Sequence, residues 1–123
     1  MSSENLKLQA LRGAITATEN TIEAIEAAVE ELVSELIARN KLNAEQIISI
    51  TFSVTNDLNA CFPASIARKK SGWERVSLLD TQQMHVKGDL ENCIRILALA
   101  WLPLGQEPKH PYLGEAKKLR PDR

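Results

Sequence analysis

This sequence of 123 residues has few cysteines, no long apolar run and no excess of charge of one sign. Its two cysteines, Cys61 and Cys93, are too few for the disulfide scaffold that stabilises small secreted proteins. No apolar run approaches the ~20 residues of a membrane-spanning helix. The first residues, 1–5, lack the basic-then-apolar pattern of a signal peptide. We therefore expect a cytoplasmic protein without a membrane partner.

The charges are balanced, with 15 lysines and arginines against 16 aspartates and glutamates, for a net charge of −1. Generic binding to nucleic acid needs an excess of cations, so we expect no nucleic-acid partner. The one feature in favour of such a partner is a basic C-terminal segment. Its basic residues are Lys109, Lys117, Lys118, Arg120 and Arg123. We expect them to give at most weak, strongly salt-dependent binding.

Glycine- or proline-rich linkers, internal repeats and low-complexity tracts are absent as well. A chain of this length suits one compact domain, so we assign residues 1–123 to a single domain. Within it we expect a loose N-terminus over residues 1–7 and an irregular C-terminal tail over about residues 105–123. The predicted strands alternate with helices, which indicates a small α+β domain of mixed α/β type.

Hydrophobic periodicity in the first third of the chain predicts a strand followed by a helix. The apolar segment Leu8–Ile15 is typical of a strand. Thr16 and Glu19 resemble a capping box, which predicts that a helix begins there and continues to about Asn40. A second cap over residues 43–46 predicts one further turn. The apolar residues of the helix recur at steps of three and four: Ile22, Ile25, Val29, Leu32 and Leu36.

The rest of the chain is predicted to contain two more strands, one short helix and a strongly apolar segment. Apolar and polar residues alternate over Ile48–Val54, which is typical of a strand with one buried face. Pro63 suits the first position of a short helix over about Pro63–Lys70. Trp73–Leu79 is the next predicted strand. After a turn at Gly88, the segment Leu90–Trp101 is strongly apolar.

Arg95 is the most informative residue, because it lies inside this apolar segment. Its neighbours on one face of a strand would be Leu97, Leu99 and Trp101. Burial of a guanidinium there is costly unless an anionic group meets it. Two interpretations remain open: a structural ion pair or strand edge, and a binding site whose anion arrives with a ligand. Arg12 gives a weaker form of this pattern beside Gly13, which allows close backbone approach.

Other polar residues indicate less by themselves. Asp80 and Gln83, three positions apart after an apolar strand, can face one pocket or simply form an exposed turn. His85 and His110 have no further ligand at metal-binding spacing, so we expect no metal site. Phosphate-loop, dinucleotide-binding and nucleophile-elbow motifs are absent, so cofactor and covalent chemistry lack support. The residues alone indicate a small domain that could bind a small anion.

Several short segments, in the same order over about residues 9–122, carry a resemblance to a known family. They are Leu11–Thr16, Thr55–Leu58, Phe62–Ala64, Ala67–Arg68, Gly72–Trp73, Gln82–Val86, Cys93–Arg95, His110–Leu113 and Leu119–Asp122. Each segment is short, but their common order makes the match specific. In these segments the chain resembles the small chorismate mutases of the AroH class.

The resemblance implies an enzyme that converts chorismate to prephenate on the way to phenylalanine and tyrosine. It also implies a homotrimer that forms a pseudo-α/β barrel, with active sites at the subunit interfaces and no cofactor or metal. The reaction is a Claisen rearrangement of a dicarboxylate with an ether bridge, and it requires no nucleophile or proton transfer. The protein should therefore act by holding the reactive conformer and stabilising charge that develops in the transition state.

The resemblance also implies roles for individual residues. Arg95 would stabilise the negative charge that grows on the ether oxygen, while Arg12 and Tyr112 would hold a substrate carboxylate. Leu119 and Arg120 would come from a mobile tail that closes over the pocket. Further substrate-binding residues would be Phe62, Ala64, Ser65, Arg68, Leu78 and Leu79, with Phe62, Ala64 and Arg68 reaching the pocket from across an interface.

Three positions depart from the family pattern. Gln83 stands where the family usually has glutamate, Asp80 where it often has cysteine, and Ser65 where lysine is common. We therefore hypothesise that Asp80 offsets the charge of Arg95 and meets the ring hydroxyl of the substrate, while Gln83 hydrogen-bonds as a neutral amide. Both would join Arg95 as catalytic residues. The alternative is a catalytically impaired relative that binds a small dicarboxylate or acts as an interaction protein.

Overall fold

A four-stranded sheet in the order β1-β4-β2-β3 is the framework of the computed structural model, which describes residues 5–120. The strands are β1 (Leu6–Thr16), β2 (Ile47–Val54), β3 (Ser77–Gln82) and β4 (Cys93–Pro103). The central strand β4 is antiparallel to β1 and β2, while β2 and β3 are parallel. Residues 1–4 and 121–123, including parts of the expected loose N-terminus and tail, lie outside the described residues.

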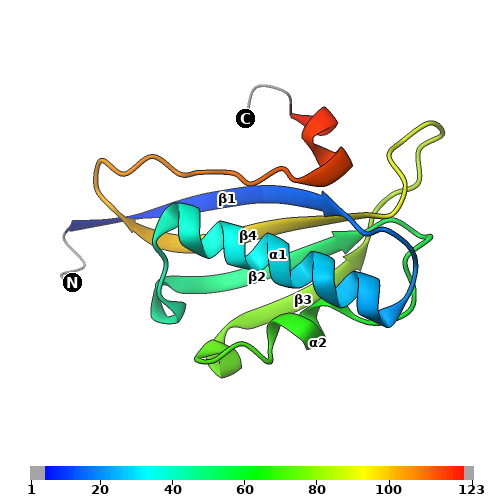
Figure 1. Ribbon diagram of the computed structural model, residues 1–123. Helices are drawn as coiled ribbons and strands as arrows, with labels where there is room; N and C mark the ends of the chain where they lie inside the picture. Colours follow the sequence, from blue (N-terminus) through cyan, green and yellow to red (C-terminus); the bar gives the residue numbers. More distant parts are fainter. Residues whose placement is uncertain (1–4, 121–123) are drawn as a thin grey trace.

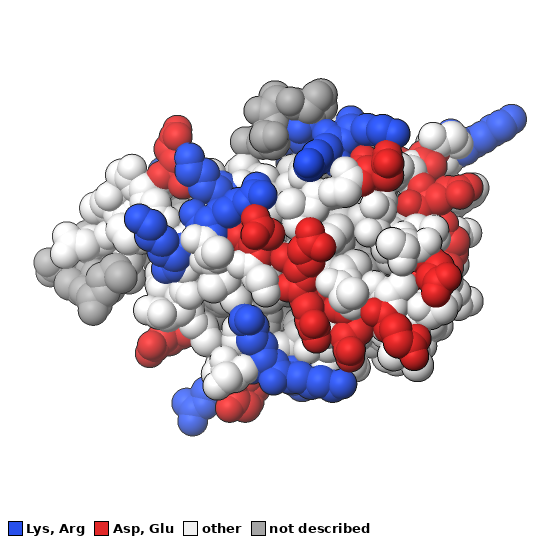
Figure 2. Space-filling view, viewed as in Figure 1, with Lys and Arg blue, Asp and Glu red and all other residues white. Residues whose placement is uncertain are grey.

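One long helix, α1 (Ile22–Asn40), crosses one face of this sheet (Figure 1). The shorter α2 (Pro63–Ala67) lies beside β3 (Figure 1). The remaining helical turns are η2 (Ala44–Gln46), η3 (Trp73–Arg75) and η4 (Gly114–Leu119). Acidic side chains gather over α1 on the face that Figure 2 shows, as its glutamate-rich sequence requires. No helix in residues 5–120 is long and apolar enough to cross a membrane.

The predicted start of α1 is wrong, although its end at Asn40 is confirmed. The helix begins after Thr21, whose Oγ1 accepts a hydrogen bond from the backbone N–H of Ala24 at 3.1 Å. Thr16 stays in β1 because it pairs there with Cys93 of β4. Strand pairing over long sequence distance therefore overrides a local capping signal.

Other predicted element boundaries also differ from those in the structure. β1 begins at Leu6, within the segment expected to be loose. β3 begins at Ser77, because Trp73 lies in the helical turn η3 and its side chain is buried. In β2, a register shift between Ile47 and Ser49 leaves Ile48 exposed, so the alternation predicted from Ile48 holds only beyond that irregularity. The predicted turn over residues 43–46 is confirmed as η2 with its capping box.

The two faces of the sheet have different surroundings. Alternate residues of β4 are buried in the core beneath α1: Ile94, Ile96, Ala98, Ala100 and Leu102. The other face of β4, which we call the open face, carries Arg95, Leu97, Leu99 and Trp101. Leu97 and Trp101 are 45% and 39% exposed there. Exposed apolar residues in a continuous row are typical of a surface that another chain covers.

Candidate active site

Arg95 lies where the open face meets a small second core. We call this core the Tyr112 cluster; it consists of Ala14, Cys93, Tyr112 and Ala116, with Leu90 and Leu119 packed against it. Burial raises the pKa of the Cys93 thiol, and the nearby Arg95 guanidinium opposes that rise. The Arg95 side chain is 32% exposed, and its Nε atom is buried without a hydrogen-bond partner among the described residues. A buried donor in this state favours the arrival of an acceptor.

Sheet register explains why Arg12 and Arg95 share a site. Arg95 pairs with Ala14 and Arg12 pairs with Leu97, so both arginines project from the open face of adjacent strands. Together with Tyr112 they line a cavity of about 420 Å³, whose other lining residues are Gly13, Ile96 and Leu97. The structure therefore brings together the three residues for which the family resemblance implies contact with the reacting oxygen or a carboxylate.

Tyr112 reaches this cavity from a segment that returns along the outer edge of β1. The N–H of Ala14 donates to the Pro111 carbonyl at 2.9 Å, and the N–H of Leu113 donates to the Ala14 carbonyl at 2.8 Å. Gly13 permits this approach, since a Cβ there would lie 2.5 Å from the Pro111 oxygen. The close backbone approach predicted at Gly13 is thus present in the structure.

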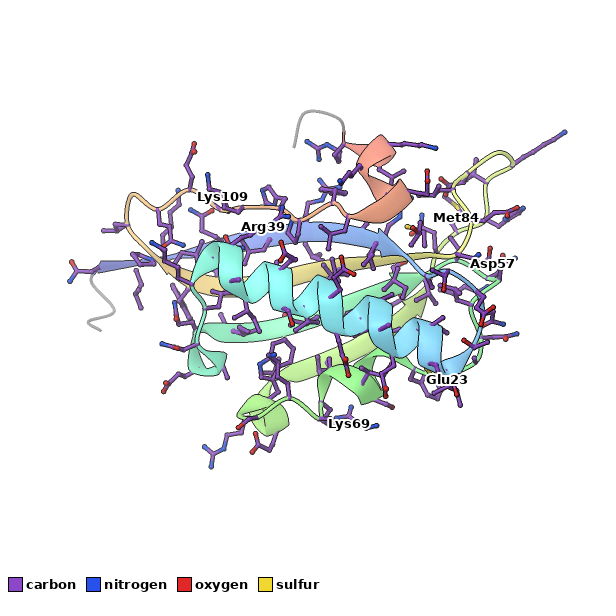
Figure 3. The ribbon with its side chains drawn as sticks, viewed as in Figure 1. Glu23, Arg39, Asp57, Lys69, Met84 and Lys109 are labelled. Carbon is purple, nitrogen blue, oxygen red and sulfur yellow. The ribbon has the colours of Figure 1, made fainter. Side chains whose placement is uncertain are left out.

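The C-terminal turn η4 follows directly and covers one end of the open face. Leu119 packs against the Tyr112 cluster, and the Oγ1 of Thr16 accepts a hydrogen bond from the N–H of Glu115 at 3.2 Å. Arg120 follows the last residue of η4 and is partly exposed. Figure 3 shows Asp57 and Met84 at this end of the molecule, where the loop between β3 and β4 rises beside η4. The predicted irregular tail is therefore partly helical and packed.

Gln83 lies on the same side of the sheet as Arg95. Its Oε1 accepts a hydrogen bond from the Ser53 hydroxyl at 3.0 Å, and Ser53 is the direct β2 partner of Arg95. The backbone N–H of Gln83 donates to the Val54 carbonyl at 2.7 Å. The amide of Gln83 is therefore held by β2 near the Arg95 position.

Asp80, in contrast, lies on the opposite face, so its predicted pairing with Arg95 is wrong. It is in register with Phe52, which pairs with Ile96 on the face covered by α1. Its Oδ1 accepts the backbone N–H of Ala64 at 3.0 Å. Burial raises the pKa of Asp80, while the hydrogen bond from Ala64 and the charge of Arg68 oppose that rise. Spacing along the sequence did not reveal that the sheet separates these two side chains.

Asp89, which no sequence pattern indicated, is the acidic partner that Arg95 has in the described residues. Its Oδ2 lies 3.6 Å from Nη2 of Arg95. The acid precedes Arg95 by six positions and sits in the β3–β4 loop, so no strand or helix periodicity connects the two residues. Gly88, immediately before Asp89, indicates a turn. A turn glycine does not indicate which residue the neighbouring acid will contact.

Four further predicted residues lie on and beside α2: Phe62, Ala64, Ser65 and Arg68. We call this surface the Phe62 wall. Phe62 is 67% exposed, whereas the Ala64 side chain is buried. Phe62 and Ser65 line a second cavity of about 750 Å³ together with Asp80. This cavity shares no lining residue with the one at Arg95. Within one chain, therefore, the two predicted halves of the site do not meet.

Leu78 and Leu79 are neighbours on β3 that point to opposite faces of the sheet. Leu79 is exposed and belongs to the open face, because its β2 partner Thr51 pairs with Leu97. Leu78 is partly buried and packs against the main core. No group of three or more histidine, cysteine, aspartate or glutamate side chains in residues 5–120 is arranged to hold a metal ion.

Comparisons with known proteins identify the family. The family model described as chorismate mutase type I matches residues 8–123. Chorismate mutase AroH of Thermus thermophilus is 41% identical over 117 residues, which are 94% of this chain and 95% of that protein. Chorismate mutase AroH of Bacillus subtilis (strain 168) is 34% identical over 118 residues, or 95% of this chain and 93% of that protein.

A solved structure gives the same result for the fold. A chorismate mutase from Clostridium thermocellum superposes with a TM-score of 0.82 and 39% sequence identity. The match covers 89% of this chain and 98% of that one. Sequence and fold thus agree over nearly the whole length, and this chain belongs to the chorismate mutase type I family.

Proposed function

We propose that this enzyme, which converts chorismate to prephenate, does so in the cavity lined by Arg12, Arg95 and Tyr112. The family membership gives the reaction. The observation that carries the assignment of the site is the buried Nε–H of Arg95, which has no hydrogen-bond partner within residues 5–120, in a cavity that a second arginine also lines. The alternative of a catalytically impaired relative has no support from the comparisons, because the matched relatives are named as chorismate mutases.

The rearrangement breaks the ether C–O bond and forms a C–C bond within one molecule, so no proton or group leaves the substrate. Breaking of the C–O bond runs ahead of C–C formation, and negative charge grows on the ether oxygen. Arg95 stabilises that charge through a guanidinium fixed beside the apolar residues of β4. Because the charge is larger in the transition state than in the substrate, this interaction lowers the barrier.

The other groups of the cavity hold the substrate in its reactive conformer. Arg12 and Tyr112 bind a carboxylate, the arginine with two parallel hydrogen bonds where the geometry allows. Gln83, held by Ser53 on the same side of the sheet, supplies a neutral amide for the ring hydroxyl. Holding both arms of the substrate in contact removes much of the entropic part of the barrier.

A second copy of the chain completes the active site. The Phe62 wall and the Arg95 cavity are separate within one chain, and Phe62 is largely exposed. The open face presents Leu97, Leu99 and Trp101 to solvent in a continuous row. We propose a homotrimer in which these apolar faces pack together and the Phe62 wall of one copy, with Leu78, closes over the Arg95 cavity of the next. Burial of the apolar row drives the assembly.

Both cysteines are free thiols, which suits a reducing compartment. We therefore assign the enzyme to the cytoplasm.

Turnover of chorismate by the purified protein tests the assignment of the site. Arg95→Ala should lower kcat by ~10²-fold or more, the usual loss when a fixed donor to a developing oxyanion is removed. Arg75→Ala is the matched control, since Arg75 is an exposed arginine of η3 outside the cavity. Chorismate decay at near wild-type rate in Arg95→Ala would overturn the proposal, and equal losses in both variants would show that the effect is not local.

A further inference from the structure

Arg95 has one acidic partner in the described residues, and that partner is partly buried as well. The Asp89 side chain is 25% exposed, and its Oδ2 lies 3.6 Å from Nη2 of Arg95. Asp57, a second carboxylate that acts on the neighbouring Cys93, accepts the N–H of Asn92 and the hydroxyl of Thr55. Across the cavity Arg95 faces Arg12, a group of like charge. Asp89 therefore supplies the local negative charge on this side of Arg95.

The loop holds Asp89 firmly in this position. Its backbone N–H donates to the Val86 carbonyl at 3.0 Å, and its Oδ1 accepts the N–H of Leu90 at 2.8 Å. Leu90 in turn packs against the Tyr112 cluster. One carboxylate oxygen is thus used to fix the loop, and the other is left for Arg95. The Arg95 guanidinium therefore has an ion-pair partner at its Nη2 end, while its Nε has no hydrogen-bond partner among the described residues.

We propose that Asp89 is a positioning residue for the reaction, which holds Nη2 of Arg95 so that the Nε edge of the guanidinium meets the substrate oxygen. This inference rests on the proposed function of Arg95. A guanidinium is planar, so an anchor at one end fixes the direction of its remaining donors. Donors held in place before the reaction stabilise the transition state without reorganising. Asp89 acts through Arg95 and does not touch the substrate.

Asp89→Asn tests the proposal, with thermal melting followed alongside kcat and KM. The variant should lose ~10-fold in kcat, equal to about 1.4 kcal/mol of transition-state stabilisation. KM should not rise, because removal of a negative charge beside the cavity does not weaken binding of a dicarboxylate. Glu91→Gln is the matched control, because Glu91 is an exposed acid of the same loop. That variant should keep both constants.

Asp89→Glu keeps the carboxylate and should recover part of the lost kcat, whatever the melting temperature of Asp89→Asn. Unchanged kcat in Asp89→Asn would overturn the proposal. A rise in kcat/KM would also overturn it, because Asp89 would then restrain Arg95 instead of aligning it. A glutamate variant no faster than the asparagine variant would contradict the role of the ion pair. In each of these cases, loss of turnover in Arg95→Ala would leave the proposed function intact.

Discussion

The Asn40 side chain and the Lys109 backbone exchange two hydrogen bonds. Nδ2 of Asn40 donates to the Lys109 carbonyl at 2.9 Å, and the Lys109 N–H donates to Oδ1 of Asn40 at 2.8 Å. Asn40 is fully buried at the end of α1, and it also donates to the Leu36 carbonyl. It thereby ties the helix to the segment that returns along β1 and carries Tyr112. A polar side chain in the core thus holds the segment that carries Tyr112 to the cavity at Arg95.

Replacement of Asn40 by alanine should lower the free energy of unfolding by ~1–3 kcal/mol, because buried backbone groups lose their partners. Denaturant unfolding measures this change. Lys109→Ala is the control, because Asn40 binds only the backbone of Lys109. That variant should have the unfolding free energy of the wild type. If Asn40→Ala were as stable as Lys109→Ala, the two hydrogen bonds would contribute nothing to stability.

Alanine at Gly13 should disturb both stability and turnover. The new Cβ would lie 2.5 Å from the Pro111 carbonyl oxygen, so the segment carrying Tyr112 must move away from β1. We expect a loss of ~1–3 kcal/mol in unfolding free energy, typical of overpacking, and a fall in kcat/KM.

The proline ring gives a second check on this contact. Pro111→Ala removes the ring atoms near Gly13 but leaves the carbonyl in place. The double variant should therefore remain as impaired as Gly13→Ala. Recovery of the double variant to the level of Pro111→Ala alone would show that the ring, and not the backbone, makes the critical contact.

Asp80→Asn should change how stability depends on pH. The pKa of Asp80 is raised in the folded protein, chiefly by burial. The stabilisation from its protonated form is therefore complete below the unfolded pKa of ~3.9, and it is lost as the pH rises through the higher folded pKa. The asparagine variant has no charge to bury and keeps an oxygen for the N–H of Ala64. It should gain stability relative to the wild type as the pH rises through that window.

Urea unfolding at several pH values measures this difference. Glu74, an exposed acid of η3, provides the control variant Glu74→Gln. The unfolding free energy of this variant relative to the wild type should not change with pH in this way. If the unfolding free energy of Asp80→Asn minus that of the wild type fell as the pH rises, the raised pKa would be contradicted.

A charge on the open face should break the proposed trimer. Leu99→Glu places a carboxylate in the apolar row of β4. The desolvation free energy of an unpaired charge buried in an interface exceeds the stabilisation from the contacts there. Sedimentation should then show a smaller species, and chorismate turnover should fall because the Phe62 wall is missing. Ile22→Glu is the control, because Ile22 is an exposed apolar residue at the start of α1. A fully active monomer of Leu99→Glu would refute the shared active site.

Local patterns in the sequence determined the kinds of elements. The apolar stripe of α1 from Ile25 onward, the end of that helix at Asn40 and the alternation in β2 beyond Ile48 appear in the structure as the sequence indicates, whereas Ile22 is exposed. The backbone sets these periods, 3.6 residues for a helix and two for a strand, so nearby residues suffice to reveal them. The apolar character of the segment that forms β4 already placed Arg95 among apolar neighbours.

Tertiary structure decided which groups meet. Tyr112 lies beside Ala14 although 98 positions separate them, and Asp89 reaches Arg95 through a loop that has no period. Asp80 and Arg95 are separated because the register of three strands assigns them to opposite faces. A side chain's direction follows from its own backbone, whereas its partner depends on how distant strands align. That alignment is fixed by packing of the whole sheet, which no single segment contains.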